Sequence, residues 1–134
     1  MSNERAAEYA AAWTRHASVS DDAEGRANLS AYLSTLEPSV VYEDVPSGAK
    51  HEGLEGVTEF CKAVSRMFAM SFKITTTQDS GEQFAFEFVC DATSSQTGKL
   101  VTFKGVAIGA FKDGKVVAHR DYYDLSGFAQ AGSR

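Results

Sequence analysis

Apolar side chains recur at helical spacing through the first half of the chain. They predict three helices, over residues 4–17, 22–36 and 54–70. Pro38 ends the second helix, because the residue before a proline avoids helical backbone angles. The apolar face of the third helix is formed by Leu54, Val57, Phe60, Cys61, Val64, Met67 and Phe68.

The period of the pattern changes from 3.6 to two after residue 71. The alternation predicts four strands, over residues 72–77, 84–93, 100–111 and 115–125. A short fifth strand, residues 40–45, precedes the third helix, and Asp113-Gly114 indicates a hairpin between the last two strands. Helices that come first and a mostly antiparallel sheet that follows predict the α+β class.

Strand alternation places the polar candidates on definite faces of the sheet. Along residues 84–93, Asp91 shares a face with Val89, opposite a row of phenylalanines, and the pattern leaves open which face contacts the helices. On the last strand, His119 and Asp121 share a face. If Asp91 and Asp121 face one cavity, they form an acid–base pair. The alternatives are an exposed Asp91 and an ion pair of Asp121 with Arg66 or His119.

Composition and charge narrow the classes of protein. The chain has 134 residues, of which 43% are hydrophobic, and a formal net charge of −5. This length and composition predict one domain over residues 1–134, with a core over residues 4–128 and a tail over residues 129–134. No cluster of Lys and Arg indicates nucleic-acid binding, and no apolar run is long enough to span a membrane. Without a signal-like start, we expect a cytoplasmic protein in which Cys61 and Cys90 are free, buried thiols.

Two stretches carry a resemblance to a known family. They are VYEDVPSGAKHEGLEGV at residues 41–57 and the segment 105–125, which contains FKDGKVV and ends in HRDYYDL. They resemble the SnoaL-like polyketide cyclase and limonene-1,2-epoxide hydrolase branch of the nuclear transport factor 2-like superfamily. The resemblance covers about residues 4–128. It implies a cystatin-like α+β barrel, in which a cone-shaped, curved sheet wraps around three helices and a deep pocket, and a homodimer that pairs through the sheet.

The resemblance also implies roles for individual residues. Asp121 matches the acid–base aspartate of the closing motif, Asp91 matches the second aspartate, and Tyr42 matches a water-holding tyrosine. Asp44 stands where the epoxide hydrolases have asparagine, and Val89 stands where they have the arginine that bridges the two carboxylates. The missing arginine argues against strict epoxide hydrolysis, whereas a cyclase or isomerase needs only an inward aspartate.

These observations predict a cofactor-free enzyme that performs acid–base chemistry on an apolar small molecule, by cyclisation, isomerisation or epoxide opening. The alternative is a non-catalytic binding or accessory protein of the same fold. We predict Asp121, Asp91 and Tyr42 as catalytic residues. His119-x-Asp121 supplies only two ligands, so we expect no metal site. The predicted substrate-binding residues are Asp44, Trp13, Phe60, Val64, Phe68, Val89 and His119.

Overall fold

The computed structural model describes residues 4–17, 22–124 and 126 of the chain. Helices and strands follow one another in an order that agrees with the predicted class. None of the helices within the described residues is long and apolar enough to cross a membrane. The elements are α1 (Glu4–Ala17), α2 (Ala23–Leu33), β1 (Leu36–Asp44), β2 (Ala49–Glu52), α3 (Gly53–Met67), β3 (Phe68–Asp79), β4 (Gln83–Ser94), β5 (Leu100–Lys112) and β6 (Lys115–Tyr123).

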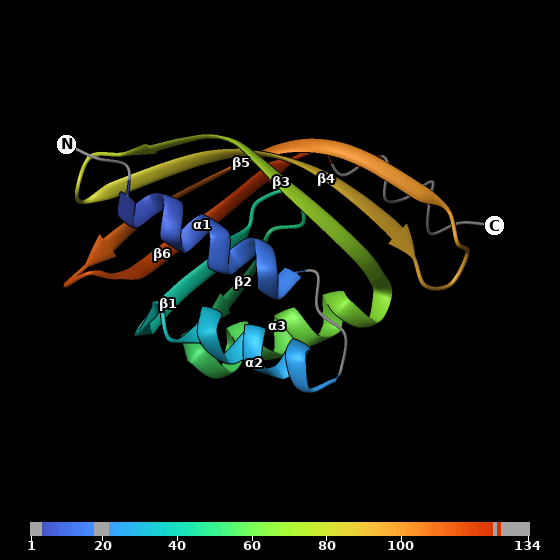
Figure 1. Cartoon of the computed structure of the whole chain (residues 1–134), viewed down its shortest axis with the longest axis horizontal. Helices are drawn as coiled ribbons and strands as arrows, with labels where there is room; N and C mark the ends of the chain where they lie inside the picture. Colours follow the sequence, from blue (N-terminus) through green and yellow to red (C-terminus); the bar gives the residue numbers. More distant parts are fainter. Residues whose placement is uncertain (1–3, 18–21, 125, 127–134) are drawn as a thin grey trace.

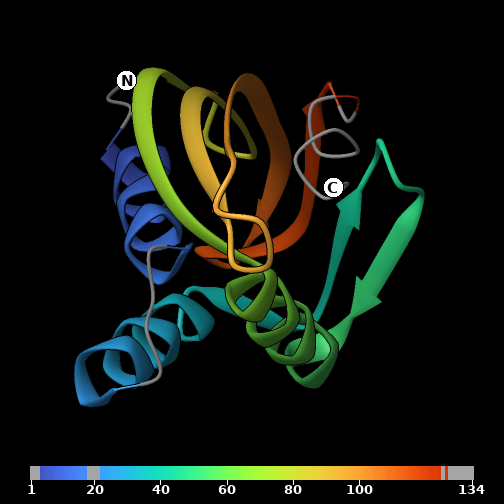
Figure 2. The same cartoon turned by 90° about the vertical axis from the view of Figure 1, so that its right-hand side faces the viewer.

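The six strands form one curved sheet in the order β2-β1-β6-β5-β4-β3. Of the strand pairs formed by the described residues, only β1–β6 is parallel. The sheet arches over the helices (Figure 1), with α1 packed against β3 and α2, and α3 packed against β1. The view from the side shows the sheet curling around the space above α3 (Figure 2). The predicted α+β fold, a curved, mostly antiparallel sheet over three helices, is confirmed.

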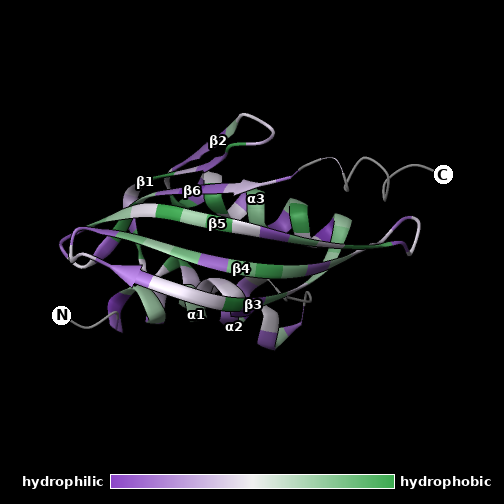
Figure 3. Cartoon of the chain, turned by 90° about the horizontal axis from the view of Figure 1, so that it is seen from above, coloured by the Kyte–Doolittle hydropathy of each residue, from purple (hydrophilic) through white to green (hydrophobic). Residues whose placement is uncertain are grey.

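The structure decides which face of the sheet contacts the helices. Phe84, Phe86, Phe88 and Cys90 on β4 are all at most 2% exposed and face inward. The alternate face therefore points away from the helices, and it is the face turned towards the viewer in Figure 3. The positions of β4 and β5 that alternate with the buried row include Val89, Val106 and Ile108, so both faces of the sheet carry apolar residues.

Two glycines of β5 allow large aromatic rings to fold against the inner face of the sheet. Gly105 and Gly109 lie opposite Phe88 and Phe84 on β4. A Cβ atom at Gly109 would lie 2.5 Å from a ring carbon of Phe84 and 2.1 Å from the Ala118 carbonyl oxygen. The rings occupy the space that side chains at these positions would fill, and this close contact accompanies the curvature of the strands.

Several predicted boundaries are wrong. The second helix ends at Leu33, and β1 already begins at Leu36, so Pro38 lies within a strand. The proline is tolerated because the register with β6 shifts between Leu36 and Val41, which leaves no ladder bond for its missing N–H. Strand β2 was not predicted, since its four residues are mostly polar.

The third helix and the following strand meet earlier in the chain than predicted. The helix ends at Met67, and β3 begins at Phe68, because residues 68–70 pair with the end of β4. β6 ends at Tyr123, two residues before the predicted end at 125. The predicted helix break at residues 18–21 and the predicted tail at 129–134 lie outside the described residues.

Candidate active site

A cavity of about 270 Å³ lies between the inner face of the sheet and the helices α1 and α3. Its wall is mostly aromatic and aliphatic, and six of the predicted binding and catalytic residues line it besides Asp121. These six are Trp13, Tyr42, Asp44, Phe60, Val64 and Phe68. The remaining lining residues are His16, Cys61, Ser65, Met67, Met70, Phe72, Phe88, Phe103 and Tyr123. The volume is close to the lower limit of ordinary ligand pockets, so the cavity suits a small ligand.

Asp121 supplies the carboxylate at the inner end of this cavity. It lies on β6 opposite Ala107 of β5, and its side chain is 10% exposed. Oδ1 lies 2.6 Å from Nε2 of His119, two residues earlier on the same face of the strand. Oδ2 accepts a 2.5 Å hydrogen bond from the Tyr42 hydroxyl of β1. Each oxygen keeps a lone pair in addition, which a bound molecule is able to use.

The direction of the hydrogen bonds around Tyr42 follows from the chemistry of its partners. Nε1 of Trp13 donates to the Tyr42 oxygen at 2.9 Å, and an indole N–H only donates. The Tyr42 proton therefore points to Asp121. Burial, together with the negative charge of Asp121, raises the pKa of Tyr42 well above its usual value, so the phenol keeps this proton. Tyr42 is thus a hydrogen-bond donor to Asp121.

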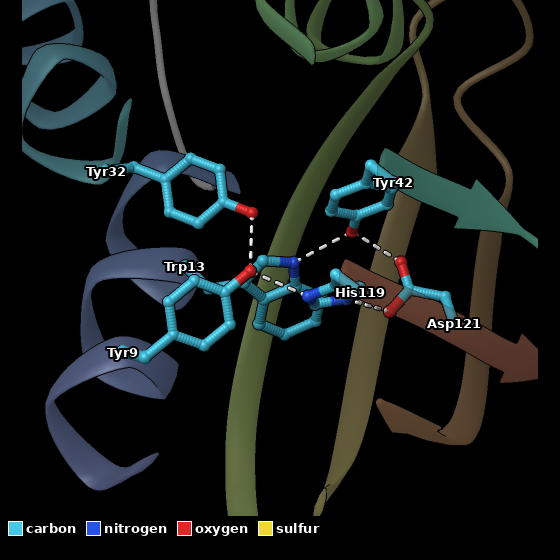
Figure 4. A network of polar contacts seen from close by, with 6 residues as sticks. All are labelled: Tyr9, Trp13, Tyr32, Tyr42, His119 and Asp121. Atoms are coloured by element: carbon cyan, nitrogen blue, oxygen red, sulfur yellow. Dashed lines mark hydrogen bonds and ion pairs between the residues drawn. The ribbon is translucent and has the colours of Figure 1, made fainter. Parts of the chain in front are cut away.

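On its other side Asp121 is joined to a buried row of polar groups (Figure 4). Nδ1 of His119 lies 2.7 Å from the Tyr9 hydroxyl, which lies 2.8 Å from the Tyr32 hydroxyl. In the tautomer that carries its proton on Nε2, His119 donates to the carboxylate from Nε2–H and accepts from Tyr9 at Nδ1. Burial raises the pKa values of Tyr9 and Tyr32, so both stay protonated. The hydrogen bonds then run in one direction, from Tyr32 to Tyr9, from Tyr9 to His119 and from His119 to Asp121.

Three of the predicted site residues do not line the cavity. Asp91 pairs with Thr102 and Asp121 with Ala107 across β5, and positions five apart on one strand point to opposite faces. Asp91 is therefore exposed on the outer face, where it accepts a hydrogen bond from Thr102. Val89 shares that outer face. The expected convergence of Asp91 with Asp121 is wrong, because the row of phenylalanines, and not the row of Asp91, faces the helices.

His119 is also misplaced by the sequence prediction. It was expected to contact the ligand, but its side chain is completely buried behind Asp121, and it stacks on Tyr42 with the ring centroids 4.2 Å apart. The contact with Asp121 is the one that the sequence offered as an alternative to Arg66. His119 therefore borders the cavity from behind, through its contacts with Asp121 and Tyr42.

Sequence reasoning missed Tyr9 and Tyr32 as polar members of the site. Both are on helices, where the pattern marks Tyr9 only as a core residue and does not single out Tyr32. A buried tyrosine hydroxyl needs a partner, and this requirement is the one signal that points to a polar neighbour. The sequence does not identify that neighbour, since His119 is 110 residues from Tyr9.

Thiol and metal chemistry find little support in the cavity. The two cysteines are free, as predicted, although Cys61 is only half-buried. Burial raises the pKa of the Cys61 thiol to about 12, and the charge of Asp121 adds to this effect, so the thiol stays protonated at neutral pH. Among the described residues, no group of three His, Cys, Asp or Glu side chains is placed to hold a metal ion.

His16 on α1 makes stability depend on pH. Burial lowers its pKa from 6.5 to about 4, an effect that the Trp13 carbonyl opposes in part, and its ring stacks on Tyr32 at 4.1 Å. The fold therefore favours the neutral ring. The neutral ring contributes its full stabilisation above pH 6.5. As the pH falls from 6.5 towards 4, the free energy of unfolding decreases by about 3 kcal/mol because the unfolded chain binds a proton at His16 more readily.

We expect the variant His16→Phe, which keeps the ring stacking, to remove this loss. Urea unfolding at pH 7, 5 and 4 gives the free energy of unfolding of the variant and of the unmodified protein. The difference between the two proteins should grow as the pH falls. His51→Phe is the matched control, because His51 also stacks on an aromatic ring, that of Phe60, but is far less buried. Parallel curves for the unmodified protein and His16→Phe would contradict the prediction.

Comparison with known proteins identifies one matching family profile and many solved structures with a similar fold. The sequence profile of the SnoaL-like domain matches residues 6–119. No curated protein matches the chain significantly.

Three solved structures illustrate the shared fold. A hypothetical protein with a ketosteroid isomerase-like fold from Catenulispora acidiphila, solved with trimethylamine, has 19% identity and a TM-score of 0.80 over 95% of this chain and 94% of its own. A proposed polyketide cyclase from Xanthomonas campestris has 20% identity and a TM-score of 0.80, over 98% and 100%. An epoxide hydrolase of the LEH-like type from M. tuberculosis has 16% identity and a TM-score of 0.73, over 96% and 89%. At these identities the similarity establishes the fold.

Proposed function

This chain belongs to the SnoaL-like domain family, and on that premise we propose that it is an enzyme that performs acid–base chemistry on a small, largely apolar molecule. The single observation that carries the proposal is the position of Asp121. Its carboxylate lines an aromatic cavity and is held from behind by two hydrogen-bond donors, His119 and Tyr42. The proposed reaction is an isomerisation or an intramolecular aldol cyclisation.

The proposed chemistry begins with a carbonyl compound bound in the cavity. The free lone pair of Asp121 takes a proton from the carbon next to the carbonyl group, and the electron pair of that C–H bond moves into the enolate. Return of the proton to another carbon gives an isomer. Attack of the enolate carbon on a second carbonyl forms a new C–C bond, and the resulting alkoxide takes the proton from Asp121. In both cases the proton balance closes without a cofactor.

Epoxide opening is the less favoured reaction. The family arginine is replaced by Val89, which lies on the outer face together with Asp91. The carboxylate pair that would activate water and protonate the epoxide is therefore not assembled from those residues. We expect the protein to hydrate epoxides poorly compared with its action on carbonyl compounds.

Deuterium exchange tests the proposal without knowledge of the natural substrate. The protein is incubated in D₂O with a panel of small cyclic and aromatic ketones and diketones, and NMR follows the loss of the C–H signals next to the carbonyl. We expect at least one compound to exchange far faster than in buffer, because an oriented carboxylate base accelerates proton transfer by about 10²–10⁴-fold.

The same experiment distinguishes an enzyme from a binding protein. A compound that binds, as shown by a thermal shift, but never exchanges faster than in buffer would favour the non-catalytic alternative. The trimethylamine in the structure of the Catenulispora acidiphila protein supports small-molecule binding in this fold.

The expected homodimer and cytoplasmic location remain proposals. The outer face of the sheet carries the partly exposed Val89, Val106 and Ile108 together with Tyr122, which is 40% exposed. An apolar sheet face of this kind suits pairing with a second copy. Light scattering of the purified protein decides between a monomer and a dimer, and fractionation of the producing cells decides the location.

A further inference from the structure

The two carboxylates of the cavity lie directly opposite one another. Asp44 at the end of β1 is in register with Asp121 on the parallel strand β6, so both side chains leave the same face of the sheet. Both line the cavity. Like charges directly opposite one another on neighbouring strands destabilise a sheet, so two acidic residues at this pair of positions call for a further explanation.

Asp44 is only partly satisfied by its neighbours. Oδ2 accepts a 2.8 Å hydrogen bond from Ser47, whereas Oδ1 is buried and has no hydrogen-bond partner among the described residues. Burial, a hydrogen bond to Asp44 and the charge of that carboxylate raise the pKa of the Tyr123 phenol, so Tyr123 stays protonated and is a second donor beside Asp44. A buried carboxylate oxygen without a donor is a position where a bound group with an N–H is expected.

The rest of the wall carries no compensating positive charge. Among the described residues that line the cavity there is no Lys or Arg. His16 lines the cavity from α1, and because burial lowers its pKa to about 4 it is neutral at pH 7. Its Nδ1 is buried and also has no hydrogen-bond partner among the described residues. The cavity therefore offers two acids and one neutral imidazole ring.

The aromatic side chains complete the environment. Trp13, Tyr42, Phe60, Phe68, Phe103 and Tyr123 are among the lining residues. The faces of aromatic rings attract cations, most strongly where water is excluded, and they accept the apolar substituents of an organic ammonium group at the same time. A strongly hydrated metal ion gains nothing from such walls, whereas a substituted amine gains from both the rings and the carboxylates.

We propose that the ligand of this cavity is an organic amine in its protonated form, with the ammonium group held between Asp44 and Asp121 and its apolar part against the aromatic wall. For the reaction, the inference rests on the proposed function and specifies its substrate class as carbonyl compounds that carry an amine. For binding, it stands on the charges and the wall of the cavity alone.

Binding of a matched pair of probes tests the inference. N,N-dimethylbenzylamine is protonated at pH 7, and isobutylbenzene is its neutral isostere. Calorimetry or ligand-observed NMR gives both affinities for the full chain. We expect the amine to bind at least tenfold more tightly than the hydrocarbon. Equal affinities would overturn the inference without the need for any variant.

Substitution of Asp44 tests whether this residue causes the preference for the amine over the hydrocarbon. We expect Asp44→Asn to reduce the preference for the amine about tenfold, to leave the binding of isobutylbenzene unchanged, and to leave the melting temperature unchanged or raised, since one of two opposed charges is gone. Glu43→Gln is the matched control, because Glu43 is the neighbouring residue on the opposite face and pairs with Arg120. An undiminished preference in Asp44→Asn, or an equal loss in Glu43→Gln, would refute the assignment.

The outcomes separate this inference from the proposed function. Amine preference without any deuterium exchange would uphold the binding site and reject the enzyme. Exchange on neutral ketones together with equal binding of the two probes would uphold the enzyme and reject the amine.

Discussion

Asp121→Asn is expected to lower the rate of proton exchange on any active compound by at least about 100-fold, the usual contribution of a positioned acid–base group. Two groups hold the carboxylate in place, His119 at 2.6 Å and Tyr42 at 2.5 Å. An amide has one acceptor oxygen, so it satisfies one of these donors and meets the other with an N–H. The variant therefore loses the base and also disturbs its supports.

A matched variant separates this effect from a general effect of charge. Asp91→Asn makes the same chemical change on the outer face, where the carboxylate is exposed and bonded to Thr102. We expect it to keep the exchange rate within about twofold of the unmodified protein. Circular dichroism establishes that both variants are folded. An Asp121→Asn protein that exchanges at the full rate would remove Asp121 from the mechanism.

Gly109→Ala is expected to produce the largest loss of stability among conservative changes. The added Cβ would lie 2.1 Å from the Ala118 carbonyl oxygen and 2.5 Å from the Phe84 ring. Because one of these neighbours is backbone, β5 and β6 must move apart or the ring must leave its place. Overpacking of this kind costs about 3 kcal/mol, near the upper end of its usual range, which corresponds to a fall in the melting temperature of about 10 °C.

The loss should extend to the site, because Gly109 pairs with His119 across the two strands. A shift of β6 there displaces the histidine that supports Asp121. Gly56→Ala is the control, since its added Cβ would lie 3.4 Å from the nearest atom, in His51, and alanine favours the helix α3. We expect this control to be as stable as the unmodified protein or up to about 1 kcal/mol more stable. Urea unfolding measures both, and similar stabilities for the two variants would contradict the packing argument.

The site illustrates which parts of a fold a local pattern is able to predict. His119 and Asp121 are two residues apart on one strand, so alternation alone places them on one face. Tyr42 and Trp13 were predicted as members of the site, and the structure joins both to it. Asp91 was misplaced because alternation gives the period of a strand and not the direction of its faces.

The pattern of apolar and polar residues did not predict which distant segments of the chain pair or pack with one another. The register between β1 and β6 sets Asp44 opposite Asp121, and it depends on a parallel pairing with a register shift after Leu36. The contacts of Tyr9 with Tyr32 and His119 likewise join α1 to α2 and to the last strand. Sequence patterns record the propensity of a segment, and they carry no direct record of which segments pack together.

The sequence by itself determined the α+β class, the order of most elements and the apolar rows of the strands, and it singled out Asp121, which lines the cavity. These features are local, since periodicity and turn residues act within a few positions of the chain. The tertiary structure alone decided which row of β4 faces the helices, that Asp91 is excluded, and that two carboxylates meet in one aromatic cavity. Burial and strand register belong to the assembled sheet, because they arise only when segments far apart in the chain pack against one another.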